Sequence, residues 1–213
     1  MKIALIGATG FVGSALLKEL LARGHEVRAL LRDPAKLAVQ PGLEVHQADA
    51  TEAEAVAAAV QGVDAVLSAY NPGWGHPALF EEFLRGSAAI TAGVKQAGVA
   101  RLLVVGGAGS LYVAPGVQLV DTPQFPAEWK AGALAAREAL NRLRGEQELD
   151  WVFVSPPAHL EPGERSGQYR LGGEELLSDA QGQSRISVAD LAVALVDELE
   201  APRHHRQRFT VAY

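Results

Sequence analysis

Short apolar runs alternate with amphipathic stretches along the whole chain. The first run covers residues 3–6, and Leu16, Leu17, Leu20 and Leu21 follow it at helical spacing. This period-switching pattern continues to the C-terminus and predicts a series of strand–helix units. We expect strands over residues 3–6, 26–31, 43–47, 64–68, 101–105, 151–154 and 208–212. We expect later helices over residues 52–60, 77–96, 127–144 and 188–199.

Strands that are apolar throughout and alternate with helices indicate a parallel sheet covered on both faces. Right-handed crossovers then give an α/β, doubly wound (Rossmann) fold. Ligands in such folds bind beyond the carboxyl ends of the strands. We therefore expect the site in the loops after Ile6, Leu31, Gln47, Ser68, Val105 and Val154. The segments 110–130 and 156–187 are expected to lie on the substrate side, the second as a small C-terminal lobe.

Composition narrows the class of protein. The chain has 213 residues, 48% of them hydrophobic, which suits a single domain over residues 1–213. A net charge of −6 without a basic stripe argues against nucleic acid as a partner. The first apolar run is too short for a signal peptide or a membrane span, so we expect a cytoplasmic protein. We expect its partner to be a small-molecule substrate. There is no cysteine, and the six histidines lack metal-ligand spacing.

Glycines interrupt the first strand–helix junction at a regular interval. Gly7, Gly10 and Gly13 frame the sequence Gly-Ala-Thr-Gly-Phe-Val-Gly, between a strand and a helix start. Such a turn aims backbone N–H groups and a helix N-terminus at one point, which suits a pyrophosphate. Gly7 permits the tight turn, and Gly10 lets phosphates approach the backbone. Gly13 lets the helix pack closely on the strand. Thr9, Phe11 and Val12 complete the predicted phosphate-binding turn.

This Gly-x-x-Gly-x-x-Gly spacing resembles the short-chain dehydrogenase/reductase superfamily in its extended and atypical branches. The segment 151–157, Trp-Val-Phe-Val-Ser-Pro-Pro, is similar to biliverdin-IXβ reductase/flavin reductase and NmrA-like proteins. Residues 166–169 and 186–190 continue that similarity, so it spans nearly the whole chain. The resemblance implies an NAD(P)-binding Rossmann domain and an oxidoreductase.

The second strand ends where an adenosine ribose is expected. An acidic residue there favours NAD, whereas arginine pairs with the 2′-phosphate of NADP. Arg32 is the predicted phosphate ligand and Lys36 adds charge, while Asp33 before Pro34 is interpreted as a helix cap. NADP is therefore the expected cofactor, with NAD the alternative. Arg32 could also be an ordinary surface charge.

The next two strands end in further cofactor candidates. In the resembling family an aspartate at the position of Asp49 binds the adenine amino group, with Ala50 beside it. Asp49 could equally cap the following helix, and both roles are compatible. Ser68, Ala69 and Tyr70 come at the end of the fourth strand, where relatives line the adenine-ribose and nicotinamide side.

The usual proton-transfer pair of the superfamily is missing. Tyr70, Tyr112 and Tyr169 are followed four residues later by tryptophan, glycine and glycine, so no Tyr-x-x-x-Lys exists. This disfavours epimerase or dehydratase chemistry. Hydride transfer to a flavin or another conjugated acceptor needs little acid catalysis, because the ring delocalises charge. Such a reductase is the leading hypothesis.

The resemblance implies a serine and a histidine in the substrate pocket. Ser110 matches the serine, and His159 lies one residue beyond the expected histidine. The nicotinamide is expected near Ser110, Ser155 and Pro156. Ser110 could instead be an ordinary turn residue and His159 a loop residue. Trp74 and Trp129 either cover a planar substrate or pack the loops.

Two alternatives to the reductase remain. One is a non-catalytic sensor of NADP(H) of the NmrA-like kind, and the other is an epimerase or dehydratase that uses unusual residues. A homodimer is compatible with the sequence.

Overall fold

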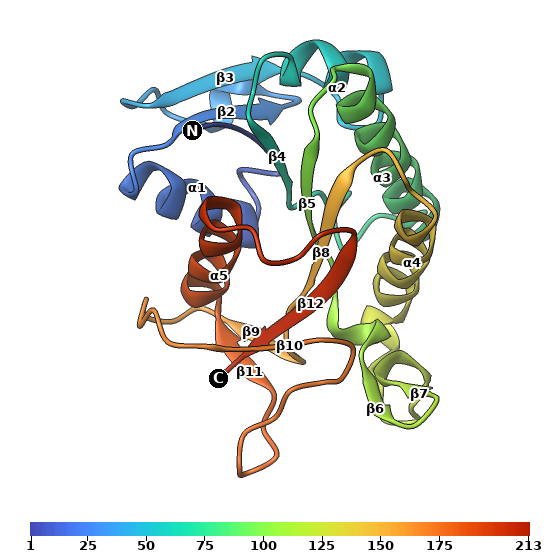
Figure 1. The fold of residues 1–213 in the computed structure, drawn as a ribbon. Helices are drawn as coiled ribbons and strands as arrows, with labels where there is room; N and C mark the ends of the chain where they lie inside the picture. Colours follow the sequence, from blue (N-terminus) through green and yellow to red (C-terminus); the bar gives the residue numbers. More distant parts are fainter.

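An eight-stranded sheet forms the centre of the molecule, in a computed structural model that describes all 213 residues (Figure 1). Its strand order is β10-β12-β8-β5-β4-β1-β2-β3. Every neighbouring pair is parallel except β10 and β12, so the doubly wound fold predicted from the sequence is confirmed. The strands are β1 (Lys2–Ile6), β2 (Glu26–Leu31), β3 (Leu43–Gln47), β4 (Ala65–Ser68), β5 (Arg101–Val105), β8 (Asp150–Ser155), β10 (Arg170–Gly172) and β12 (Gln207–Ala212).

Five helices cover the two faces of this sheet. Alternate residues of β1 point to opposite faces, as the pleat requires. Ile3 and Leu5 pack with α1 (Phe11–Ala22) and α5 (Val188–Glu200) in one core. Ala4 and Ile6 pack in a second core with α2 (Ala53–Val60), α3 (Leu79–Gln96) and α4 (Ala127–Arg144). Burial on both faces explains why these strands are apolar throughout.

Short elements occupy the two segments expected on the substrate side. The first holds an antiparallel hairpin of β6 (Tyr112–Ala114) and β7 (Val117–Gln118), followed by a 3₁₀ turn (Leu119–Asp121). The second holds β9 (His159–Glu161) and β11 (Arg185–Ser187), which pair in parallel. It also supplies β10, the antiparallel strand at the edge of the main sheet. Strands of two or three residues carry too little periodicity to be predicted.

The strand order reverses direction at β1. The chain runs from β1 outward to β3 and then crosses to β4 on the other side of β1. Loops that leave β1 and β4 therefore diverge, which opens a crevice at the carboxyl edge of the sheet. None of the helices combines the length and the apolar character that spanning a membrane requires.

Candidate functional site

The glycine turn after β1 is built by close backbone contacts. Gly7 has a positive φ of 85°, and a Cβ added there would lie 2.4 Å from the Ala69 carbonyl oxygen. A Cβ on Gly13 would lie 1.9 Å from the carbonyl oxygen of Gly7. Both positions therefore require glycine, one for the turn and one for packing the first helical turn of α1 on it.

The N-terminus of α1 has the properties of an anion site. Gly10 is its N-cap residue and no side chain caps the helix. A Cβ on Gly10 would meet only the Gly7 oxygen, at 3.4 Å, so its outer side is open. The first turn contains no acidic residue. The free N–H groups and the positive end of the helix dipole are thus available to a phosphate.

A large cleft runs along the carboxyl edge of the sheet. Its volume is about 960 Å³, near the top of the range of about 300–1,000 Å³ for small-molecule sites. Residues from the loop after each of β1, β2, β3, β4, β5 and β8 line it. The cleft therefore lies where the doubly wound topology places a ligand.

Most of the predicted cofactor residues line this cleft. They are Gly7, Thr9, Gly10, Phe11, Val12, Arg32, Asp49, Ala50, Ala69, Tyr70 and Pro156. Ser68 and Ser155 do not, because their side chains are buried within the ends of β4 and β8. The hydroxyl of Ser155 has no hydrogen-bond partner.

The end of the cleft beside β2 and β3 carries the charged residues. Arg32 and Lys36 line it, and neither side chain forms an ion pair. Asp33 caps the following 3₁₀ turn by accepting a hydrogen bond from the Ala35 N–H at 3.1 Å, as interpreted from the sequence. One oxygen of Asp33 is thus engaged locally, its Oδ2 makes no hydrogen bond in the protein, and the Arg32 side chain has no partner.

Asp49 also has a local role in this end of the cleft. Its carboxylate accepts hydrogen bonds from the N–H and the hydroxyl of Thr51, at 2.9 and 2.8 Å. The backbone hydrogen bond from Thr51 is the main reason why the pKa of Asp49 lies below its ordinary value. One carboxylate oxygen, Oδ2, makes no hydrogen bond in the protein. The predicted contact with an adenine amino group thus remains a prediction that this geometry allows.

The sequence analysis did not predict Arg85 as a residue of this end, nor the contact that the predicted residue Tyr70 makes with α3. The exposed Arg85 lies on α3 and lines the cleft, paired only with Glu82 one turn earlier at 2.8 Å. Tyr70 donates its hydroxyl to the Glu82 carbonyl oxygen at 3.1 Å, and burial raises the pKa of Tyr70. Gly86 leaves room for the ring, since a Cβ there would lie 2.2 Å from it. Gly86, a glycine in the interior of a helix, was the sequence signal that a side chain packs closely on α3 at this point.

The cleft lining also includes aromatic rings, prolines and a histidine, a set that we call the aromatic chamber: Trp74, Phe125, Trp129, Pro156, Pro157 and His159. The rings of Trp74 and Trp129 meet edge to face, with centroids 4.8 Å apart. Trp74 also packs on Gly132, where a Cβ would lie 2.5 Å from the ring. The two indoles therefore pack on each other and on α4 while lining the cleft, and the cover over a planar substrate stays a prediction.

The two predicted catalytic residues lie in different environments. His159 lines the chamber, and its imidazole makes no hydrogen bond within the protein. Ser110 does not line the cleft: it is 3% exposed, and its hydroxyl accepts a hydrogen bond from Arg208 at 2.8 Å. The adjacent Gly109 lines the cleft instead. This geometry gives Ser110 a structural contact and no direct access to a ligand.

Only part of the segment 156–187 faces the cleft. Residues 156–160 line it, whereas the rest packs beside α1 and α5 or at the sheet edge. From the segment 110–130, Leu119, Thr122, Gln124, Phe125, Pro126 and Trp129 line the cleft. The second segment is thus less of a substrate lobe than expected.

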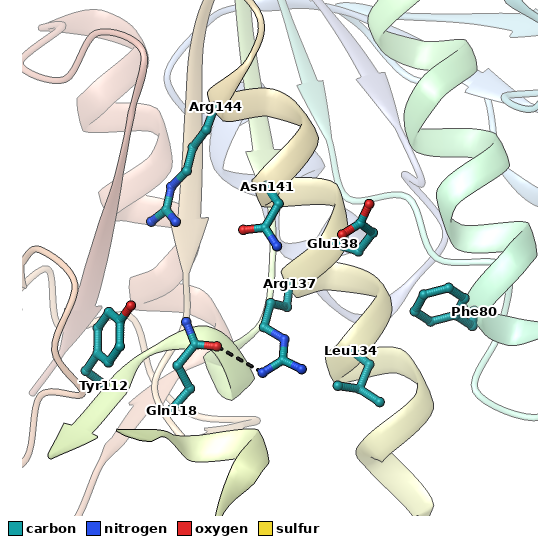
Figure 2. A pocket seen from close by; sticks show the side chains of 8 residues that line it. All are labelled: Phe80, Tyr112, Gln118, Leu134, Arg137, Glu138, Asn141 and Arg144. Atoms are coloured by element: carbon teal, nitrogen blue, oxygen red, sulfur yellow. Dashed lines mark hydrogen bonds between the residues drawn. The ribbon is translucent and has the colours of Figure 1, made fainter. Parts of the chain in front are cut away.

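A second hollow of about 590 Å³ lies on the outer side of α4 (Figure 2). The two arginines that line this hollow already have partners within the protein. Arg137 binds Gln118 and the Asp121 carboxylate, and Arg144 pairs with Glu174 at 2.8 Å. It therefore offers fewer free groups to a ligand than the main cleft.

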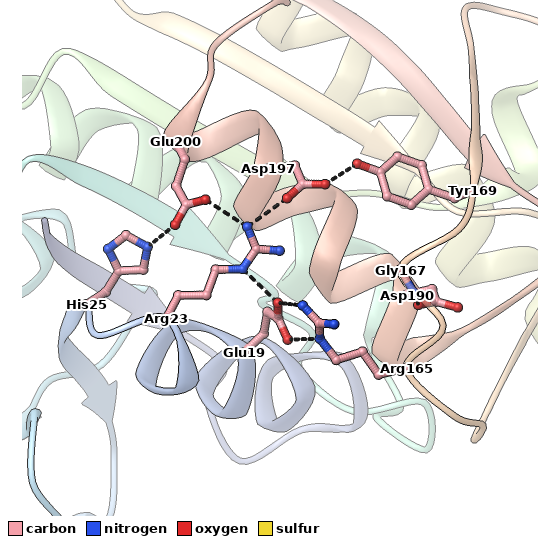
Figure 3. A network of polar contacts seen from close by, with 9 residues as sticks. All are labelled: Glu19, Arg23, His25, Arg165, Gly167, Tyr169, Asp190, Asp197 and Glu200. Carbon is pink, nitrogen blue, oxygen red and sulfur yellow. Dashed lines mark hydrogen bonds and ion pairs between the residues drawn. The ribbon is translucent and has the colours of Figure 1, made fainter.

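An ionic network fixes the far end of α1 (Figure 3). Arg23 binds Glu19, Asp197 and Glu200, each at 2.7 Å, which joins α1 to α5. Arg165 binds both carboxylate oxygens of Glu19 at 2.8 Å. The helix that begins at the glycine turn is therefore anchored both to α5 and to the segment between β9 and β10.

Comparison with known proteins identifies the family. Residues 7–199 match the model of a family described as NAD(P)H-binding. The chain is 41% identical to the uncharacterised protein YwnB of Bacillus subtilis, over 99% of this chain and 98% of that one.

Two solved structures are similar over the full length of this chain. A candidate epimerase of Bacteroides thetaiotaomicron has a TM-score of 0.93 and 48% identity, with 96% of that chain covered. A candidate NADH-flavin reductase of Streptococcus pneumoniae has a TM-score of 0.85 and 36% identity, with 99% of that chain covered.

The family match and the glycine turn after β1, where the strand order reverses, both indicate a site for a nicotinamide nucleotide. Both confirm the resemblance to atypical short-chain dehydrogenases/reductases and indicate a nicotinamide nucleotide as the cofactor. The chain belongs to the NAD(P)H-binding family.

Proposed function

We propose that this protein is an NADPH-dependent reductase that transfers hydride to a flavin-like or other conjugated acceptor. One observation carries the proposal: a single cleft joins the glycine turn to the aromatic chamber. A dinucleotide held at the turn would extend from the charged end toward the chamber, where an acceptor can stack. The family match and the solved relative described as a candidate NADH-flavin reductase support a reductase.

The residues at the charged end favour NADPH over NADH. Arg32 lines the cleft after β2 without an ion pair, and Lys36 lies one turn further on. A guanidinium in this position matches the geometry of a 2′-phosphate. Asp33, which would favour NADH, holds the following 3₁₀ turn through one of its carboxylate oxygens.

The chamber suits hydride transfer without a dedicated acid. NADPH, when bound, would supply the hydride from its dihydronicotinamide ring. Trp74, Trp129 and Phe125 would hold a planar acceptor by stacking and limit the access of water. The imidazole of His159 has no partner in the protein and can hydrogen-bond an acceptor oxygen or nitrogen.

The test is a calorimetric titration of NADPH and NADH, followed by NADPH oxidation with riboflavin as the acceptor. We expect NADPH to bind at least about tenfold more tightly than NADH, and riboflavin to accelerate its oxidation. Absence of binding by either nucleotide would overturn the proposal. Tight NADPH binding without turnover of riboflavin or a quinone would favour the alternative, a redox sensor of the NmrA-like kind.

A further inference from the structure

Charge is sorted along the cleft. The charged residues that line it are Arg32, Asp33, Lys36, Asp49, Glu82 and Arg85. The first four lie in the loops after β2 and β3, on one side of β1, where the strand order reverses. Glu82 and Arg85 belong to the first turns of α3, where the Glu82 carbonyl oxygen accepts from Tyr70. The charges of Arg32 and Arg85 both act on Asp49, so the Glu82–Arg85 pair lies beside the first four at the end predicted for the adenosine.

The aromatic chamber has no charged side chain in its lining. Besides its aromatic rings and prolines, it presents the neutral polar groups of Thr122 and Gln124 and the imidazoles of His76 and His159. His76 is engaged, because its Nδ1 accepts from the Ala78 N–H at 3.2 Å. The nearby charges of Asp121 and Arg137 pair with each other outside the cleft, at 2.8 Å.

The chamber walls are held in place by packing. Trp74 lies against Gly132 of α4, and Trp129 lies one turn earlier on the same helix. Their edge-to-face contact fixes the two rings relative to each other. Aromatic faces held in this way favour a ligand with a flat ring system, which can stack on them.

An anionic ligand would be penalised in this chamber. Removing a charge from water without a partner costs several kcal/mol, and the lining holds no lysine or arginine. Pro126 and Trp129 at the N-terminus of α4 line the cleft, and Glu128 lies in the first turn of this helix. That helix end suits the partial negative charge of a carbonyl oxygen better than a full anion. The phosphates of a dinucleotide at the glycine turn would repel an anion further.

We propose that the chamber takes uncharged, planar fused-ring acceptors of the quinone class and discriminates against their anionic counterparts. This inference rests on the proposed reductase function. The reaction balances as quinone plus NADPH plus one proton, giving hydroquinone plus NADP⁺. The hydride brings two electrons to the quinone, and solvent water supplies the proton.

The test compares 1,4-naphthoquinone with 1,4-naphthoquinone-2-sulfonate, which differ by one negative charge. Binding is measured in saturating 1,4,5,6-tetrahydro-NADP, whose nicotinamide ring is uncharged and cannot transfer hydride, by quenching of tryptophan fluorescence. Trp74 and Trp129 report on the chamber, whereas Trp151 is 2% exposed and gives a constant background. We expect the sulfonate to bind at least about tenfold more weakly, equivalent to about 1.4 kcal/mol.

A charge-introducing variant makes the test specific to this chamber. Gln124→Lys places a cation in the lining, and we expect it to recover at least about tenfold in affinity for the sulfonate. Gln96→Lys is the matched control, because Gln96 is exposed at the end of α3 and does not line the cleft. The control is expected to change neither affinity.

The outcomes separate the two proposals. Equal binding of the two quinones, or no binding of the uncharged one, would overturn the inference about the chamber. An unchanged preference in Gln124→Lys would do the same. Failure of NADPH to bind, or of any acceptor to be reduced, would instead overturn the proposed reductase function.

Discussion

The hydroxyl of Ser110 accepts a hydrogen bond of 2.8 Å from the guanidinium of Arg208. The Arg208 side chain is fully buried, pairs with Glu174 through its other terminal nitrogen, and leaves its Nε without a partner. Ser110 therefore offsets part of the cost of burying an arginine beneath the loop that follows β5. The residue that resembles a catalytic serine thus has a supporting contact.

Ser110→Ala is expected to reduce stability more than activity. Loss of the acceptor leaves a second nitrogen of Arg208 unpaired, which costs about 1–3 kcal/mol in the free energy of unfolding. Urea unfolding and riboflavin-dependent NADPH oxidation would measure the two effects. Ser178→Ala is the control, because Ser178 is exposed and lies outside the cleft. A large loss of turnover at unchanged stability would restore a catalytic role for Ser110.

Gly13→Ala is expected to disrupt the nucleotide site. The added methyl group would lie 1.9 Å from the Gly7 carbonyl oxygen, so the helix or the turn must shift. We expect a destabilisation of about 1–3 kcal/mol, as for other overpacked sites, and a loss of nucleotide affinity. Gly173→Ala is the control, since a Cβ there meets no atom within 4 Å. Wild-type NADPH affinity in Gly13→Ala would contradict the role of this turn.

Arg32→Gln is expected to reduce NADPH affinity selectively. A charge-assisted hydrogen bond contributes about 1.5–3 kcal/mol, which corresponds to a loss of about tenfold to a hundredfold. NADH lacks the 2′-phosphate and should bind as before. Calorimetric titration of both nucleotides checks this, with Arg142→Gln on the exposed face of α4 as the control. An equal loss for both nucleotides would point to a role of Arg32 in adenine binding instead.

Glu19 is expected to make stability depend on acid pH (Figure 3). The hydrogen bond from Arg165 is the main reason why the pKa of Glu19 lies below its ordinary value. Because the folded pKa is lower than the unfolded one, about 4.3, the stabilisation is complete above that pH. It is lost as the pH falls through the folded pKa.

Urea unfolding between pH 7 and pH 3 tests this relationship. Glu19→Gln should be less stable than the wild type at pH 7 and should lose less stability on acidification. Glu26→Gln is the control, since Glu26 is exposed on β2 and forms no ion pair. Parallel pH profiles for wild type and Glu19→Gln would show that other carboxylates govern acid unfolding.

The strand–helix alternation was sufficient to predict the architecture. The strands Glu26–Leu31, Leu43–Gln47 and Arg101–Val105 and the helix Ala127–Arg144 have the predicted boundaries. Long apolar or amphipathic elements are predictable locally, because their periodicity matches burial on the sheet. The antiparallel β10 was not, since three residues that include the exposed Leu171 carry no pattern.

By itself the sequence determined the doubly wound fold, the glycine turn and the position of Arg32 at the end of the second strand, beside the cleft. These features depend on neighbouring residues and on a topology that follows from strand–helix order. Only the tertiary structure decided that Ser110 contacts Arg208, 98 residues away, and that Trp74 lies on Gly132. It also brought charged and aromatic residues from six different loops into one cleft. Such contacts join segments distant in the chain, and no local pattern encodes which distant side chain will fill a given space.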